Sequence, residues 1–136
     1  MPRQIFITLP PQSQGIHLIT DAIVSRLGQL PPTGLLHVFV QHTSCALCVN
    51  ENYDPDVRAD MEKILHRLVP ESQPYYRHTL EGPDDMPAHA KAALLGSGLI
   101  LPITNGRLNL GAWQGIYLCE FRRNGGPRKL VATVMP

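Results

Sequence analysis

Alternating apolar and polar positions predict several strands in the first part of the chain. Residues 3–9 carry apolar side chains at every second position, which is typical of a strand with one buried face. Residues 35–40 carry apolar side chains at both odd and even positions, the pattern of a strand that is covered on both faces. Residues 46–49 continue in the same character, and residues 15–19 predict a further strand.

Helical spacing of apolar residues indicates three helices between these strands. Residues 21–30 space their apolar side chains by three and four, which predicts a short helix capped by Asp21. Asp54, directly before a proline, is a strong start signal for a second helix, and an apolar stripe continues from there. A third, shorter helix is expected after the acidic pair 84–85, with Gly96 ending it.

The last third of the chain has the pattern of hairpins. Strands over residues 99–103 and 107–110 flank an Asn-Gly pair, the strongest short hairpin signal in the sequence. Strands over residues 116–122 and 128–134 flank Asn-Gly-Gly at 124–126, which predicts a second hairpin. Strands with interspersed helices, ending in hairpins, predict an α+β fold with a mostly antiparallel sheet and two or three helices.

Length and composition fit a single domain over residues 1–136. A domain commonly has ~100–200 residues, and the chain is 43% apolar and 17% charged, which suits a compact core. A net charge of +1 gives no overall attraction to nucleic acid or to an anionic membrane. No apolar run approaches the ~20 residues of a membrane span, and the N-terminus lacks the apolar stretch of a signal peptide. We therefore expect a cytoplasmic protein with neither nucleic acid nor membrane as a partner.

The three cysteines do not predict a disulfide framework. Cys45, Cys48 and Cys119 are an odd number in a chain without a secretion signal. Cys45 and Cys48 form a C-x-x-C pair, but on a strand they point to opposite faces, and a zinc knuckle needs a second pair of ligands. We interpret all three as small core residues.

His42 directly follows the most apolar strand, on the same face as that strand's buried residues if alternation continues. The hydroxyl residues Thr43 and Ser44 follow it. Such a histidine is either a core residue whose nitrogens bond to the backbone or a group that binds a metal or transfers a proton.

Two further histidines have acidic or hydroxyl neighbours. His78 lies in a short extended stretch, and His89 lies four residues after Asp85, so that helical spacing places this pair on one face. Asp85 would there either cap the helix or orient the imidazole. Three imidazoles from separate segments, with an open position, are a known way to hold a catalytic divalent metal. The remaining histidines lack such neighbours and are expected to be structural or exposed: His17, His37 and His66.

Other polar and aromatic residues also stand out. Asp60 lies beside the apolar stripe of the second helix, where a carboxylate is either half in solvent or paired. Glu51 lies in a polar strand-to-helix turn. Trp113, the only tryptophan, lies between glycines with Gln114 after it. This tryptophan either stacks on a heteroaromatic ring whose edge Gln114 reads, or fills the core at a bend.

Several of these segments resemble the signature of the YjbQ family. The resemblance covers residues 42–47 followed by 50–52, the stretches 76–78 and 84–89, and above all residues 106–114. These blocks occur in the family's order and together extend over nearly the whole chain.

The resemblance implies a compact α+β fold and assembly as a homotrimer in which a neighbouring subunit completes the site. It also implies an enzymatic activity. That activity is secondary thiamine-phosphate synthesis, which joins hydroxymethylpyrimidine diphosphate to a thiazole phosphate and releases pyrophosphate. The implied ligands of a divalent metal, zinc or magnesium, are His42, His78 and His89, and the accompanying acids are Glu51, Asp60 and Asp85. We expect a small phosphorylated molecule to contact Thr43, Arg77, Arg107, Trp113 and Gln114, with Lys91 as a further basic candidate.

The sequence departs from the family's pattern at two places, and it allows other functions. Ala112 replaces the usual threonine before the Trp-Gln pair, and residues 121–128 form a lengthened segment before strand 128–134. One alternative is a metal-dependent hydrolase of a small substrate, in which Glu51 or Asp85 moves the proton. The other is a trimeric module that binds an anion without catalysis.

Overall fold

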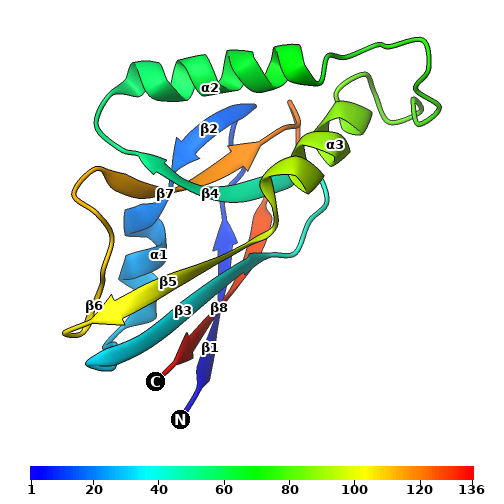
Figure 1. Cartoon of the computed structure of the whole chain (residues 1–136). Coiled ribbons are helices and arrows are strands. Elements are labelled where there is room, and N and C mark those ends of the chain that lie inside the picture. The colour runs from blue at the N-terminus through cyan, green and yellow to red at the C-terminus, as the bar shows by residue number, and fades with distance from the viewer.

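Two antiparallel sheets form the centre of the fold in the computed structural model, which describes residues 1–136 (Figure 1). The larger sheet has the order β1 (Arg3–Leu9), β8 (Arg128–Met135), β3 (Thr33–Val40), β5 (Gly98–Thr104) and β6 (Arg107–Leu108). The smaller sheet has the order β2 (Gly15–Leu18), β7 (Gln114–Glu120) and β4 (Cys45–Glu51). The helices are α1 (Thr20–Leu27), α2 (Pro55–Leu68) and α3 (Asp85–Leu95). The predicted antiparallel α+β class is confirmed.

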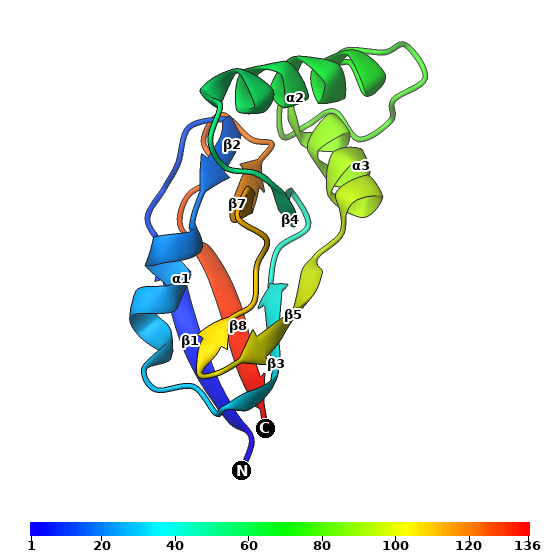
Figure 2. The ribbon, with the colours of Figure 1, turned by 60° about the vertical axis from the view of Figure 1, so that its left-hand side comes forward.

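The main core lies between the two sheets, and a second core lies between the smaller sheet and two helices. Every second residue of β3 faces the main core, where Leu36, Val38 and Val40 are buried. Leu65 of α2 and Ala88 of α3 pack in the second core. Figure 2 shows α2 and α3 beside the smaller sheet, away from the larger one. The smaller sheet is therefore the layer on which α2 and α3 pack, while the buried residues of α1 belong to the main core.

The cysteines lie in these two cores as free thiols. Cys45 belongs to the main core, while Cys48 packs against the second core, so the predicted opposite orientation is confirmed. Cys48 lies next to Cys119 of the neighbouring strand, with 3.6 Å between the sulfur atoms.

Local signals predict the start of α2 correctly and the start of α1 wrongly. The Asp54 carboxylate accepts a hydrogen bond of 2.9 Å from the backbone N–H of Asp56, as expected of an N-cap before a proline. Helix α1 begins at Thr20, so Asp21 lies in its first turn and is not the cap. The Thr20 hydroxyl accepts a hydrogen bond from the Ile116 N–H of β7, which fixes the chain there. None of the three helices has the length and apolar character needed to cross a bilayer.

One predicted hairpin is confirmed and the other is wrong. Strands β5 and β6 pair around Asn105 and Gly106, whose φ angles of 52° and 76° suit a two-residue turn. Strands β7 and β8 belong to different sheets, so residues 121–127 carry the chain from one sheet to the other. A buried ion pair joins the two ends of this crossing, Glu120 and Arg128, which are only 0% and 3% exposed.

The crossing includes a glycine that no other residue can replace without a shift. A Cβ at Gly125 would lie 2.6 Å from Arg128 Nη2 and 2.6 Å from Glu120 Oε1. Gly125 therefore packs directly over the buried ion pair.

The outer face of the larger sheet, defined here by Phe6, Leu35, Phe39, Ile100 and Met135, carries large apolar side chains that the single chain leaves exposed. Phe6 is 67% exposed and Ile100 68% exposed. The predicted covering of β3 on both faces is therefore not found within one chain. The register places Phe6 and Phe39 on either side of one residue of β8, so the two rings belong to one row across the sheet.

Candidate metal centre

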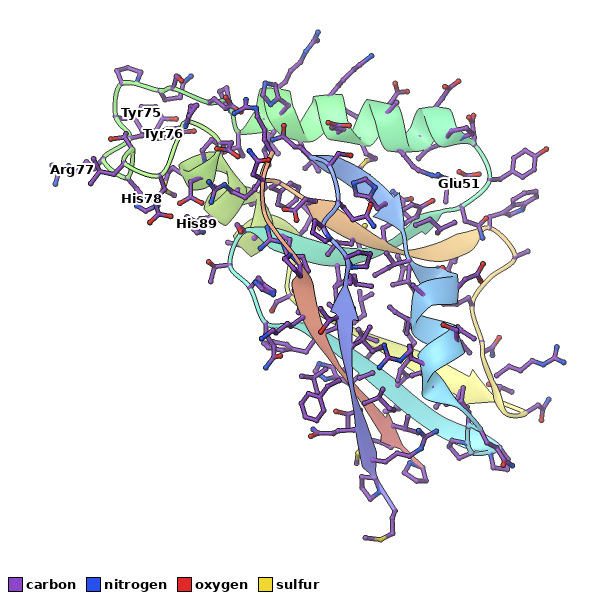
Figure 3. The ribbon with its side chains drawn as sticks, turned by 180° about the vertical axis from the view of Figure 1, so that it is seen from behind. Glu51, Tyr75, Tyr76, Arg77, His78 and His89 are labelled. Atoms are coloured by element: carbon purple, nitrogen blue, oxygen red, sulfur yellow. The ribbon has the colours of Figure 1, made fainter.

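Three side chains meet at the start of α3. The ligating atoms of His78, Asp85 and His89 all lie within 4.8 Å of one another. Asp85 is only 1% exposed and begins the helix, and His89 lies one turn later on the same face. His78 comes from the loop between α2 and α3, which folds back toward the helix (Figure 3). The predicted facing of Asp85 and His89 is thus confirmed.

The hydrogen bonds of His89 define where its protons lie. Its Nδ1 lies 2.8 Å from the carbonyl oxygen of Thr43, and because a carbonyl oxygen can only accept, Nδ1 carries a proton. Its Nε2 lies 3.0 Å from Asp85 Oδ2, and His78 Nε2 lies 2.5 Å from the same oxygen. An ionised Asp85 accepts from both rings, so these bonds require a proton on each Nε2 as well. A divalent cation among the three atoms would replace the Nε2 protons, while the bond to Thr43 would continue to hold the His89 ring.

Arg122 fixes the other oxygen of Asp85. Its Nη1 lies 2.7 Å from Asp85 Oδ1, and its Nε donates to Asp84 Oδ2 at 3.1 Å. Burial alone would raise the pKa of Asp85, but the hydrogen bond from His78, with the charges of His89 and Arg122, lowers it below the ordinary value. The carboxylate therefore stays ionised and presents Oδ2 to the imidazoles.

His42 lies near this cluster but is not part of it. Its Nε2 accepts a hydrogen bond of 2.8 Å from the backbone N–H of Lys129, so the proton of the neutral ring lies on Nδ1. Burial, followed by the charge of Arg128, lowers the pKa of His42 and favours this neutral form. His42, Thr43 and His89 line one cavity of about 380 Å³. Within one chain the ligand set is two imidazoles and a carboxylate, and the metal-binding role of His42 remains a prediction.

A second group of predicted residues lies at the far end of β4. Gln114 pairs with Glu51 across β7 and β4, and the Trp113 ring packs edge-on against Tyr53, with 5.3 Å between ring centroids. Strand β4 spans roughly 20 Å, and Figure 3 shows Glu51 far from His78 and His89. Trp113 is largely exposed and does not fill the core. The chain alone does not bring this group to the histidines.

The other predicted residues lie outside both groups. Asp60 is exposed on α2, with no ion pair to a neighbour. Arg77 projects from the exposed loop beside His78 (Figure 3), and Arg107 lies on the β5–β6 hairpin. Thr43 contributes its backbone carbonyl to His89. Their proposed contacts with a substrate remain predictions.

Sequence reasoning did not identify Arg122 as part of the site. The residue lies in the lengthened segment after β7, where the local pattern indicates only a hairpin. A usable signal was present, since two neighbouring acids at a helix start, 84–85, need nearby cations if they are buried. Arg122 and Arg123 supply these cations.

Fold and site together define a small α+β protein with two antiparallel sheets and a His–Asp–His cluster. The sequence matches the profile of the YjbQ family, described as UPF0047 protein YjbQ-like, over residues 5–136, and the chain belongs to this family. It is 54% identical over 130 residues to the UPF0047 protein YjbQ of Salmonella typhimurium, with 94% of each chain covered. It is 48% identical to the protein of the same name from Escherichia coli O157:H7, again with 94% of each chain covered.

Solved structures have the same fold. A conserved hypothetical protein from Thermus thermophilus superimposes with a TM-score of 0.83 at 36% identity, over 97% of this chain and 99% of that one. A YjbQ/UPF0047 family protein from Clostridium acetobutylicum gives a TM-score of 0.82 at 35% identity, over 96% and 99% of the two chains.

Proposed function

We propose that this protein is a metal-dependent enzyme that acts on a small phosphorylated molecule and binds a divalent cation with His78, Asp85 and His89. The observation that carries the proposal is the arrangement of donors around one point. Two imidazole nitrogens and one carboxylate oxygen converge, while Thr43 and Arg122 hold His89 and Asp85 from behind. Such supporting bonds are typical of protein metal sites.

The donor atoms favour zinc over magnesium. Zinc is commonly held by histidine and carboxylate, and catalytic zinc sites have three protein ligands and one open position. Magnesium prefers oxygen ligands, of which this cluster offers one. We therefore expect zinc, or another transition metal that accepts imidazole, to be the cofactor.

The cavity that His42 shares with His89 is the natural place for the substrate. His42 would present its Nδ1–H there, because Lys129 occupies its Nε2. Asp85 stays ionised and keeps the two imidazoles oriented. A divalent cation, when bound, supplies positive charge that neutralises phosphate oxygens and favours loss of a proton from water.

Two reactions fit this site. In the transfer reaction implied by the family resemblance, a C–N bond forms between the pyrimidine methylene and the thiazole nitrogen while the C–O bond to diphosphate breaks. In the alternative, water cleaves a phosphate ester. The ligand set by itself favours hydrolysis, because water can occupy the open position.

Metal content and turnover test the proposed function together. Protein purified without chelators should bind about one zinc per chain, measured by elemental analysis and by calorimetric titration of the metal-free form. The zinc-loaded protein should then release pyrophosphate from hydroxymethylpyrimidine diphosphate with thiazole phosphate, or phosphate from simple phosphate esters. Protein that binds no zinc at micromolar concentration would contradict the proposal.

We also propose that three copies of the chain assemble through the outer face of the larger sheet. Phe6, Phe39 and Ile100 leave large apolar side chains in solvent on this face, and contiguous exposed apolar patches mark interaction surfaces. No other element of the chain covers these side chains, because the main core lies on the opposite face of the sheet. As the family resemblance implies, a neighbouring subunit would then complete the site.

Phe39→Glu should separate the subunits. A carboxylate at the centre of the apolar row has to be buried without a partner on assembly, so the molar mass by light scattering should fall from three chains to one. The variant should still bind zinc while losing turnover, because the site is no longer completed. Leu80→Glu, which changes a fully exposed residue outside this face, is the matched control and should remain a trimer. A wild type that is monomeric at micromolar concentration would exclude the assembly.

A further inference from the structure

Lys91 is buried on the side of α3 that faces away from the metal centre. It lies two residues beyond His89, which turns its side chain to the opposite side of the helix. The residue is only 4% exposed, yet its ammonium forms no hydrogen bond and no ion pair. The ammonium lies over the face of the Phe121 ring, 5.6 Å from Nζ to the centroid, while the carboxylates of Glu71 and Glu62 act on it only from beyond ion-pair distance. A charged group on a side chain this buried is costly unless an anion or water pairs with it.

This ammonium borders a cavity of about 390 Å³ between the smaller sheet and the two helices. The cavity wall comes from the start of β2, one face of α2, Lys91 of α3 and the end of β7. The only fully enclosed side-chain nitrogen or oxygen without a partner is Arg58 Nε. The ammonium of Lys91 is therefore not sealed in the protein but reaches the open space of the cavity. A volume of this size suits a small metabolite.

The charges around the cavity favour an anion. Lys63 and Arg67 of α2 also line it and have no ion-pair partner in the chain. Of the two lining carboxylates, Glu120 is neutralised by Arg128, which leaves Glu62 as the one unpaired carboxylate of the wall, against the three cations Lys63, Arg67 and Lys91. Unpaired cations thus outnumber unpaired carboxylates along the wall.

We propose that this cavity is a second binding site, which takes a small organic anion, a carboxylate or a phosphate ester with an apolar body. Lys91 pairs with the anionic group. Ile16, Leu65 and Phe121 supply an apolar wall for the rest of the molecule. The anion gives the buried ammonium the partner that the chain does not provide, and the charge-assisted hydrogen bonds that form are among the strong ones.

The electrostatics of Lys91 agree with this role. Burial lowers the pKa of Lys91 below its ordinary value, and the carboxylates of Glu71 and Glu62 raise it only in part. Glu71 is already paired with Arg123. A bound anion next to Nζ would raise the pKa of Lys91 again.

The site is independent of the metal centre. His78, Asp85 and His89 do not line this cavity, and Lys91 does not line the cavity beside His89. Its occupation therefore neither requires nor excludes the proposed metal-dependent function, and chelator-treated protein is suitable for its test.

NMR of the lysine side chains can test the proposal directly. Lys63, Lys91 and Lys129 are the only lysines, so ¹³C-labelled lysine gives three resolvable ε signals. Phenyl phosphate and benzoate are the probes with an apolar body, and inorganic phosphate is the probe without one. We expect the Lys91 signal to shift with both aromatic probes, and more weakly with inorganic phosphate. Lys91→Met should weaken their binding about 10- to 100-fold.

Control variants distinguish binding at Lys91 from unfolding, from binding at another lysine and from binding at the metal centre. Lys91→Met should melt no lower than the wild type, because methionine keeps the packing of the stem and removes an unpaired charge. Lys129→Met, at an exposed lysine, and His89→Ala, in the metal centre, should both leave probe binding unchanged. Equal binding by Lys91→Met, or a Lys91 signal that no probe shifts at millimolar concentration, would overturn the proposal. Loss of probe binding in His89→Ala would show that the two sites are not separate.

Discussion

Asp85→Asn should reduce the affinity for zinc by at least about 100-fold, the upper end of what is lost when only a supporting residue is removed. Asparagine keeps the shape of the side chain but removes the charge that two imidazoles and a guanidinium surround. Zinc would then be held by two neutral nitrogens and a weak amide oxygen. Calorimetric titration of metal-free protein measures the change directly.

A graded set of variants makes this result specific. Arg122→Met leaves all three ligands in place but releases Asp85 Oδ1, so its loss should be smaller, about 10- to 100-fold. His66→Gln, at an exposed histidine of α2 outside the cluster, should leave the affinity unchanged. Zinc binding by the wild type should also release protons, because the hydrogen bonds place protons on both imidazole nitrogens that face Asp85. Equal affinities in the wild type and Asp85→Asn would mean that the cluster is only a buried ion pair.

Arg128→Met should destabilise the fold by about 3–5 kcal/mol, the cost of leaving a buried charge without its partner. Arg128 donates two hydrogen bonds to Glu120, with distances of 2.7 Å and 2.5 Å, and a further one of 3.0 Å to the Ser44 hydroxyl. Burial alone would lower the pKa of Arg128, but the hydrogen bond to Glu120 raises it above the ordinary value. Without this guanidinium, the Glu120 carboxylate remains in the core with little to stabilise its charge. Urea denaturation monitored by circular dichroism measures the loss.

The double variant Glu120→Leu with Arg128→Met is the control for this prediction. Replacing both members of a buried pair by apolar residues of similar volume is often neutral or stabilising. We therefore expect the double variant to recover most of the stability that Arg128→Met loses. A single variant as stable as the wild type would mean that water or a neighbouring group reaches Glu120.

Much of the fold could be predicted because its signals are local. The strand over residues 3–9, the Asn-Gly hairpin and the proline-marked start of α2 each depend on a few neighbouring residues. The pairing of Asp85 with His89 is equally local, since four residues along a helix return to the same face. These features follow from backbone geometry and not from the rest of the molecule.

The features that could not be predicted depend on contacts between distant segments. The Asn-Gly-Gly stretch at 124–126 has hairpin chemistry, but the buried pair of Glu120 and Arg128 holds the chain at the crossing between the two sheets. His42 lies near the predicted site, yet the backbone of β8 occupies its Nε2. Arg122 binds Asp84 from 38 residues further along the chain, a separation at which periodicity carries no information.

The crossing between β7 and β8 supports the cluster of His78, Asp85 and His89 from outside. Its Arg122 holds Asp85 and its Arg123 holds Glu71, at the two ends of the loop that carries His78. Inserting or deleting one residue in the crossing would displace both guanidinium groups while leaving every metal ligand unchanged. Under the proposed metal binding, a change in the length of this segment would therefore alter the affinity for the cation from a distance, without any change of ligand.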